Sequence, residues 1–416
     1  MNIYVEVYGC TANKSDAALI KGLIKNSKHK LINDIFQADF LVILTCTVID
    51  TTEQRMISLL KKYKKMGKKI IIAGCMASIQ ADKLKKIFPD AWFLPAQFSH
   101  HIIDLVEEKD AVFKQVNKTK FCKSYDDIIA PISISEGCMF SCTYCITSLA
   151  RGKLRSFPIK EIKKDVTYAV LNNCKEIQLT AQDTSSYGLD INTDLGRLLK
   201  NVCEIDRIFR IRIGMMNPYT CMNNLDSIIN GFQNSKIYKF LHMPIQSGDD
   251  DILKKMNRKY KIIDVLKVIE RFRESFPDLT LSTDIIVGFP SETNAQFQNT
   301  IDILKKIKPD ITNITRFSAR PFTKAKTMSK RVNTEIVKKR SKKLTEICSK
   351  ISYDKNKKCI GNKYEILITE KGKNDTFVGR AENYKPVVIR KQVEIGDFFT
   401  VEIINSEKTY LVGSLK

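Results

Sequence analysis

The first hundred residues alternate short, continuous apolar runs with longer amphipathic segments. The apolar runs predict strands and the amphipathic segments predict helices, at Ile3–Val7, Asn13–Lys25, Phe40–Leu44, Thr51–Met66, Lys69–Ala73 and Ala81–Phe88. Apolar strands separated by helices are typical of a parallel sheet that is covered on both faces. The pattern therefore predicts an N-terminal doubly wound α/β domain over residues 1–104.

A second alternation of strands and helices begins near residue 131 and continues to about residue 323. Six strands are predicted, at 132–136, 176–180, 209–213, 240–243, 280–287 and 310–316. A closed (β/α)₈ barrel would need eight strands, so we expect a partial (β/α)₆ barrel. The region between the two alternations, residues 105–130, loses periodicity and gains charge, which predicts a linker.

The C-terminal region changes period again. Residues 324–358 contain 13 Lys and Arg against three acidic residues, and Leu344, Ile347 and Ile351 form an apolar stripe at helical spacing. We expect a basic helix that closes a barrel domain spanning 131–350 and offers a phosphate-binding face; a merely solvated helix is the alternative. Five short strands at 364–369, 376–379, 386–390, 398–404 and 409–412 predict a small β-barrel of the oligonucleotide-binding kind over 351–416.

Composition narrows the partners and the compartment. The formal net charge is +23, which would attract polyanions and makes nucleic acid the first partner to consider. A Lys-rich surface without a partner is the alternative. No run of about 18 apolar residues is present, so no membrane span is expected. The 12 Cys and the absence of an export signal at the N-terminus predict reduced thiols in the cytoplasm.

Three of these thiols, Cys138, Cys142 and Cys145, are spaced four and three positions apart directly after a predicted strand. A loop this short can place three thiolates on one four-iron cluster and leave the fourth iron open. S-adenosylmethionine (SAM) could chelate that iron, and an electron from the cluster would break its sulfonium bond. A zinc site would need a fourth ligand, and the chain has four His and no second Cys-x-x-Cys. A redox pair and a coincidental spacing of the three Cys also stay open.

Three more thiols follow the three N-terminal strands. Cys10, Cys46 and Cys75 each come two or three residues after a predicted strand, at the edge of a parallel sheet where ligands bind. We predict a second three-thiolate cluster there; the alternative is three buried Cys that act as small hydrophobes. Cys122 stays unassigned. The remaining thiols are interpreted as packing residues: Cys174, Cys203, Cys221, Cys348 and Cys359.

Five local motifs carry a resemblance to a known family. They are Tyr8-Gly-Cys-Thr-Ala-Asn13, Glu136-Gly-Cys-Met-Phe-Ser-Cys-Thr-Tyr-Cys145, Met243-Pro-Ile-Gln-Ser-Gly248, Thr283-Asp-Ile-Ile-Val-Gly-Phe-Pro290 and Gly379-Arg-Ala-Glu-Asn-Tyr384. Over essentially its whole length the chain resembles a methylthiotransferase of the radical SAM superfamily, and the last motif resembles the RNA-binding TRAM module. One departure is Phe322 in Arg320-Pro-Phe-Thr323, where relatives often carry Gly.

The resemblance implies two [4Fe-4S] clusters and SAM as cofactors. Cys138, Cys142 and Cys145 would hold the catalytic cluster that cleaves SAM to a deoxyadenosyl radical, with Tyr144 packed near the adenine. An auxiliary cluster that carries the sulfur to be inserted would be held by Cys10, Cys46 and Cys75. SAM would be used twice, as methyl donor and as radical source. Candidates for the SAM or substrate pocket, all at or near strand ends, are Gln182, His242, Gln246, Ser247 and Asp284; His242 and Asp284 could instead be satisfied structural groups.

The N-terminal motif that ends at Lys14 is most similar to the archaeal and eukaryotic branch of this family. That branch turns threonylcarbamoyladenosine at position 37 (t6A37) of tRNA into its 2-methylthio form. Methylthiolation of isopentenyladenosine, or of an aspartate in a ribosomal protein, and RNA binding without catalysis are the alternatives. The positive charge favours RNA over a basic ribosomal protein. The implied partners are a tRNA anticodon stem-loop, a flavodoxin- or ferredoxin-like electron donor and a sulfur source.

Overall fold

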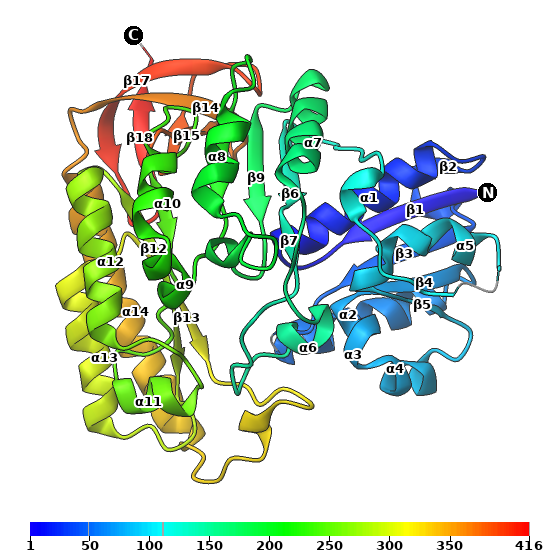
Figure 1. Cartoon of the computed structure of the whole chain (residues 1–416), viewed down its shortest axis with the longest axis horizontal. Helices are drawn as coiled ribbons and strands as arrows, with labels where there is room; N and C mark the ends of the chain where they lie inside the picture. Colours follow the sequence, from blue (N-terminus) through cyan, green and yellow to red (C-terminus); the bar gives the residue numbers. More distant parts are fainter. Residues whose placement is uncertain (49, 110–111, 416) are drawn as a thin grey trace. The chain divides into compact units, whose positions relative to one another are not determined.

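The computed structural model describes residues 1–48, 50–109 and 112–415 (Figure 1). The chain divides into two compact units, which we describe separately. The first unit holds Met1–Ala169 together with the short segments Thr180–Gln182 and Ser318–Lys326. The second unit holds Val170–Leu179, Asp183–Phe317 and Thr327–Lys416. Both predicted clusters would therefore belong to the first unit, because all six of their Cys lie before residue 169.

The first unit begins with a five-stranded parallel sheet in the order β2-β1-β3-β4-β5. The strands are β1 (Asn2–Val7), β2 (Lys30–Ile32), β3 (Phe40–Thr45), β4 (Lys69–Gly74) and β5 (Trp92–Pro95). The three predicted strands are confirmed. The two edge strands were not predicted, because runs of three and four residues are too short to show a period.

Helices cover both faces of this sheet, which confirms the doubly wound fold. One core joins α1 and α5 to the sheet through Ile20, Ile102 and Val42, and a second core joins α2, α3 and α4 through Leu60 and Ile72. The helices are α1 (Thr11–Lys25), α2 (Asp50–Lys64), α3 (Cys75–Ile79), α4 (Ala81–Ile87) and α5 (Ile102–Val106), with the 3₁₀ helices η1 (Ile35–Gln37) and η2 (Ala96–His101).

The predicted linker packs against the rest of the first unit. Lys118 and Lys123 are buried within it, and the Ser124 N–H donates to the Ala18 carbonyl at 2.9 Å. The charged residues of this segment are thus partly interior. It contains η3 (Lys118–Lys120) and leads to β6 (Ile129–Ser133), β7 (Ser135–Glu136), α6 (Thr147–Arg151), β8 (Arg155–Ser156) and α7 (Ile159–Leu171). The predicted domain boundaries themselves stay predictions.

The second unit contains most of the predicted barrel. Parallel pairing joins β9 to β10 and β11 to β12 and β13, and an isolated parallel bridge pairs Ile211 of β10 with Ile237, which lies just before β11. The predicted strands are present as β6 and as β9 (Glu176–Thr180), β10 (Arg210–Ile213), β11 (Phe240–His242), β12 (Thr280–Val287) and β13 (Ile311–Arg316). The helices are α8 (Leu195–Cys203), α9 (Pro218–Asn223), α10 (Leu225–Phe232), α11 (Asp250–Lys255), α12 (Ile262–Ser275) and α13 (Asn294–Ile307), with η4 (Thr184–Ser186).

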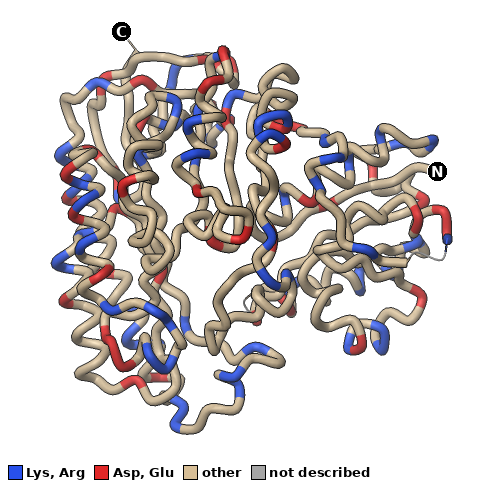
Figure 2. Tube along the Cα trace, viewed as in Figure 1, with Lys and Arg blue, Asp and Glu red and all other residues tan. Residues whose placement is uncertain are grey.

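A long helix and a closed barrel end the second unit. The predicted basic helix is α14 (Thr334–Lys357), which buries Leu344 and Cys348 and follows η5 (Lys324–Lys326). The predicted five-stranded barrel is present and closed, in the order β14-β15-β16-β18-β17, with strands β14 (Lys363–Lys371), β15 (Phe377–Ala381), β16 (Pro386–Ile389), β17 (Phe398–Ser406) and β18 (Leu411–Ser414). Figure 2 shows Lys and Arg along every part of the chain, interleaved with acidic residues.

Candidate functional site

The N-terminal sheet brings Cys10, Cys46 and Cys75 to one edge. Cys10 is the N-cap of α1 after β1, Cys46 follows β3, and Cys75 begins α3 directly after β4. Because β1, β3 and β4 are parallel neighbours, these positions share the carboxyl edge of the sheet. The turn before Cys10 packs tightly: a Cβ added to Gly9 would lie 2.9 Å from the Cys46 Cβ.

These three thiols differ in exposure. Cys10 is exposed, whereas Cys46 and Cys75 are buried. Burial raises the pKa of both buried thiols, to about 11 for Cys75. Cys46 and Cys75 would therefore be neutral at pH 7 until iron binding displaces their protons.

The second set of thiols lies on the loop between β7 and α6. The Cys138 N–H donates to the Gly152 carbonyl at 3.0 Å, and the Cys145 N–H donates to the Cys142 carbonyl at 3.1 Å. The Phe140 N–H donates to the Cys138 sulfur at 3.5 Å. Gly137 has a φ of 78° and its added Cβ would lie 1.9 Å from the Lys153 carbonyl oxygen, so the loop requires glycine there.

The donor chemistry fits iron–sulfur clusters better than single ions. Among the residues that the structure describes, no group of three or more His, Cys, Asp or Glu is spaced to hold a single metal ion. The thiolates of a four-iron cluster each bind a different iron, so they need not meet the spacing of single-ion ligands. Two sets of three thiols suit such clusters, whereas a structural zinc site would need a fourth ligand, and the described part of the chain holds no grouping that supplies one.

Two more expected site residues lie in the first unit. Tyr144 belongs to the cysteine loop, whose Thr143 carbonyl accepts from the Ala325 N–H at 2.7 Å. The side-chain carbonyl oxygen of Gln182 is buried and has no hydrogen-bond partner among the described residues. An unsatisfied buried acceptor is costly, so Gln182 is available to a ligand that donates an N–H or O–H.

The segment that carries Ala325 also contacts α2 and the loop that follows β3. The buried Arg320 forms an ion pair with Glu53, and its guanidinium donates to the Thr47 hydroxyl, next to Cys46, at 3.1 Å. Phe322, at the position where the family often has Gly, adopts a left-handed φ of 62° and is 73% exposed. The local backbone is thus one that glycine adopts freely and phenylalanine adopts under strain.

The remaining expected residues lie in the second unit. The His242 Nε2 lies 3.0 Å from the Asp284 Oδ2, and the Asn313 amide donates to the Asp284 Oδ1 at 2.7 Å. Burial would raise the pKa of the Asp284 carboxyl, but His242 and Asn313 hold it below its usual value. The Gln246 N–H donates to the Asp284 carbonyl at 2.8 Å. Ser247 is buried, and its hydroxyl accepts from the Asp249 N–H.

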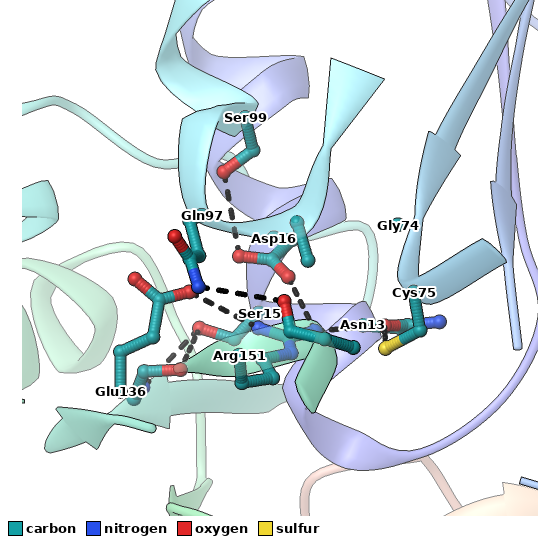
Figure 3. Close-up of polar contacts among 12 residues, drawn as sticks. Asn13, Ser15, Asp16, Gly74, Cys75, Gln97, Ser99, Glu136 and Arg151 are labelled. Atoms are coloured by element: carbon teal, nitrogen blue, oxygen red, sulfur yellow. Dashed lines mark hydrogen bonds and ion pairs between the residues drawn. The ribbon is translucent and has the colours of Figure 1, made fainter. Parts of the chain in front are cut away.

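Sequence reasoning missed a buried ionic cluster in the first unit. Asp16, Lys118, Glu136 and Arg151 are each at most 5% exposed, and Figure 3 shows Arg151 between Asp16, Glu136 and Asn13. The polar residues Asn13 and Asp16 sit at i and i+3 on the buried side of α1, where their neighbours Ala12, Ala17 and Ile20 are apolar. That pattern is a signal for a buried polar face, although it does not identify the partner.

The cysteine loop after β7 and the α/β barrel strands that follow define a radical SAM enzyme. Comparison with family profiles agrees: the Radical SAM superfamily matches residues 132–304, an uncharacterized protein family, UPF0004, matches 2–94, and the TRAM domain matches 357–416. A solved structure of the radical SAM methyltransferase TsrM from Kitasatospora setae has the same fold, with a TM-score of 0.57 at 11% identity, covering 78% of this chain and 76% of that one.

Full-length relatives define the family more narrowly. The probable threonylcarbamoyladenosine tRNA methylthiotransferase of Archaeoglobus fulgidus is 38% identical over 100% of this chain and 99% of its own length. The Xenopus laevis threonylcarbamoyladenosine tRNA methylthiotransferase is 30% identical over 99% of this chain and 76% of its own length. The ribosomal protein uS12 methylthiotransferase RimO of Clostridioides difficile is 32% identical over 100% of this chain and 99% of its own length. The chain belongs to the radical SAM methylthiotransferase family. No helix in the described residues is both long and apolar enough to span a bilayer.

Proposed function

We propose that this enzyme converts t6A37 of tRNA into its 2-methylthio form. The observation that carries the proposal is the convergence of Cys10, Cys46 and Cys75 at one sheet edge, in the same compact unit as the Cys138–Cys145 loop. The archaeal relatives named for this substrate are 34–38% identical over nearly the whole chain, against 32% for the uS12 enzyme. The identity thus favours the nucleoside over the ribosomal protein.

The reaction explains the need for two sets of thiols. The C2–H of adenine is neither acidic nor easily attacked by a nucleophile, so acid–base groups alone would not replace it. The loop set would hold one [4Fe-4S] cluster and the sheet-edge set a second. When bound, the two clusters and SAM supply the electron, the radical, the sulfur and the methyl group.

The other expected site residues would bind and orient SAM and the nucleoside. The Gln182 side-chain carbonyl would accept a hydrogen bond from SAM, and Tyr144 would pack against its adenine. The Asp284 carboxylate stays ionised and is held by His242 and Asn313, so it would accept hydrogen bonds from hydroxyl or amino groups of SAM or the nucleoside. Gln246 and Ser247 fix the turn that follows β11 beside Asp284.

The partners follow from charge and from the C-terminal barrel. We infer that α14 and the TRAM barrel bind the phosphates of a tRNA anticodon stem-loop; exposed lysines on α14 include Lys342, Lys343 and Lys350. Reduction of the loop cluster requires a one-electron donor, for which a flavodoxin- or ferredoxin-like protein is suited, and each turnover consumes a sulfur atom from a separate source. We place this reaction in the cytoplasm, where thiols stay reduced.

Iron and acid-labile sulfide per chain test the cluster assignment. After anaerobic reconstitution we expect about eight irons in the parent and about four in each of two matched variants, C138A/C142A/C145A and C10A/C46A/C75A. About four irons in the parent that vanish in the first variant would overturn the methylthiotransferase proposal. Anticodon stem-loops that carry t6A or isopentenyladenosine, and uS12 protein, then test the substrate by mass spectrometry. A gain confined to a substrate other than t6A would reassign it; the expected gain is about 46 Da, from replacing H by SCH₃.

A further inference from the structure

One buried side chain joins the two cysteine sets. Arg151 ends α6, six residues after Cys145, and is 3% exposed. Its Nη2 lies 2.7 Å from the Asp16 Oδ2 and donates to the Asn13 Oδ1 at 2.8 Å, while its Nη1 lies 3.4 Å from the Glu136 Oε1 (Figure 3). The guanidinium thus reaches from the cysteine loop to the first turn of α1, directly after Cys10.

Asn13 in turn touches the ends of all three strands that precede the N-terminal thiols. Its amide nitrogen donates to the carbonyl of Tyr8, before Cys10, at 2.8 Å and to that of Thr45, before Cys46, at 2.9 Å. Its Oδ1 lies 3.9 Å from the Cys75 sulfur. Asn13 is fully buried, so these contacts are fixed by packing. The bond from Arg151 therefore orients a side chain that contacts all three strand ends.

The charge balance around Arg151 points the same way. Asp16 and Glu136 face Lys118, Arg151 and the partly exposed Arg155, so these five side chains carry one excess positive charge. A [4Fe-4S]²⁺ core with three thiolates has a charge of about −1, and about −2 after one-electron reduction. Arg151 is close enough to Cys75 and Cys10 to interact with them electrostatically. A fixed cation at this point offsets the cost of placing an anionic cluster beside a buried region.

We propose that Arg151 is a positioning residue that orders the three N-terminal thiols through Asn13 and supplies the positive charge that favours the reduced auxiliary cluster. This inference rests on the proposed function, because it requires the second cluster. Reduction adds one electron, from a chemical reductant such as dithionite, to the [4Fe-4S]²⁺ core and breaks no bond, so a nearby positive charge raises the midpoint potential.

The test uses the full chain with C138A/C142A/C145A, so that any iron and any electron paramagnetic resonance signal belong to the auxiliary site. In this background R151Q removes the charge, and R151K keeps it but lacks the two guanidinium nitrogens, Nη2 and Nη1, that reach Asn13 and Glu136 at the same time. The matched control is R155Q, because Arg155 also pairs with Glu136, at 3.3 Å, and is 31% exposed. We expect a more negative midpoint potential and less retained iron in R151Q, a near-parental potential with less retained iron in R151K, and parental values in R155Q.

Each result separates this inference from the proposed function. If the parent background binds no iron, both fall. If it binds about four irons and R151Q and R151K match it in iron content, line shape and potential, the role of Arg151 is refuted and the second cluster stands. Equal shifts in R151Q and R155Q would also refute it, because they would report the loss of a Glu136 partner. If R151Q does not fold, parental iron content in R151K is still enough to refute the positioning role.

Discussion

Asp310, directly before β13, links this strand to the C-terminal barrel through Lys385. Its replacement tests how the barrel packs within the second unit. The Asp310 carboxylate, 2% exposed, lies 2.7 Å from the Lys385 Nζ, pairs with Lys355 and accepts from the Leu281 N–H at 2.9 Å. D310N keeps the shape of the side chain and removes the charge. Lys385, 8% exposed, would then be a buried cation without an acid partner.

The expected cost follows from the burial of the partners. Breaking a fully buried ion pair on one side costs about 3–5 kcal/mol, and Lys355, 26% exposed, can still be hydrated. We therefore expect D310N to destabilise the second unit by about 3 kcal/mol. That is roughly a 150-fold faster hydrogen exchange of the most protected amides in β14 to β18, since about 1.4 kcal/mol is tenfold.

The assay is hydrogen exchange with mass spectrometry, with D302N on the exposed face of α13 as the matched control, expected within about 0.5 kcal/mol of the parent. In D310N/K385M the stranded ammonium is removed, and we expect part of the loss to be recovered. Hydrogen exchange in D310N that is no faster than in D302N would refute the reasoning. A D310N/K385M variant that is less stable than D310N would also refute it, because removing the unpaired ammonium should restore stability.

The pH dependence gives the same test a sign. Burial alone would raise the pKa of the Asp310 carboxyl, but Lys385 and Lys355 hold it below its usual value. Its stabilising contribution is therefore complete above the unfolded pKa of about 3.9 and is lost as the pH falls through the lower folded pKa. The stability difference between parent and D310N should be constant from about pH 8 to pH 5 and shrink below about pH 4. A difference that grows with acid would contradict the assignment.

Three further predictions test other parts of the chain. F322G should stabilise the protein by about 0.5–1 kcal/mol in urea unfolding relative to F322A, because it relieves left-handed strain at an exposed position; equal stability would contradict this. G137A should lose the iron of the Cys138–Cys145 loop, because the added Cβ would clash with the Lys153 carbonyl. G67A is the control and should keep this iron, because Gly67 also has a positive φ but has open space around it. Retention of iron in G137A would show that the loop can shift. Replacing three exposed lysines of α14 by Gln should reduce the magnitude of the slope of log K against log salt for tRNA binding by about 2–3. The lysines to replace are Lys342, Lys343 and Lys350, and Lys61 and Lys62 are the controls. An unchanged slope would show that α14 does not contact the tRNA phosphates.

Most of the secondary structure and both sets of cysteines could be predicted from the local sequence. Strand and helix periods set the doubly wound domain, the six barrel strands, the basic helix and the closed C-terminal barrel, because burial on one face or both imposes those periods on neighbouring residues. The cysteine loop was equally local, since Cys138, Cys142 and Cys145 lie within one short turn. Cys10, Cys46 and Cys75 could be expected at one edge because parallel strands end together.

The tertiary structure decided what those local patterns cannot encode. The edge strands β2 and β5 form because a neighbouring strand offers hydrogen bonds, and their own residues are too few to show a period. The bond from Arg151 to Asn13 joins residues 138 positions apart. The pairing of Lys and Arg side chains with buried carboxylates depends on distances in the folded chain. A sequence rich in Lys is compatible with many different pairings. The link between the two cysteine sets is therefore a property of the packed structure.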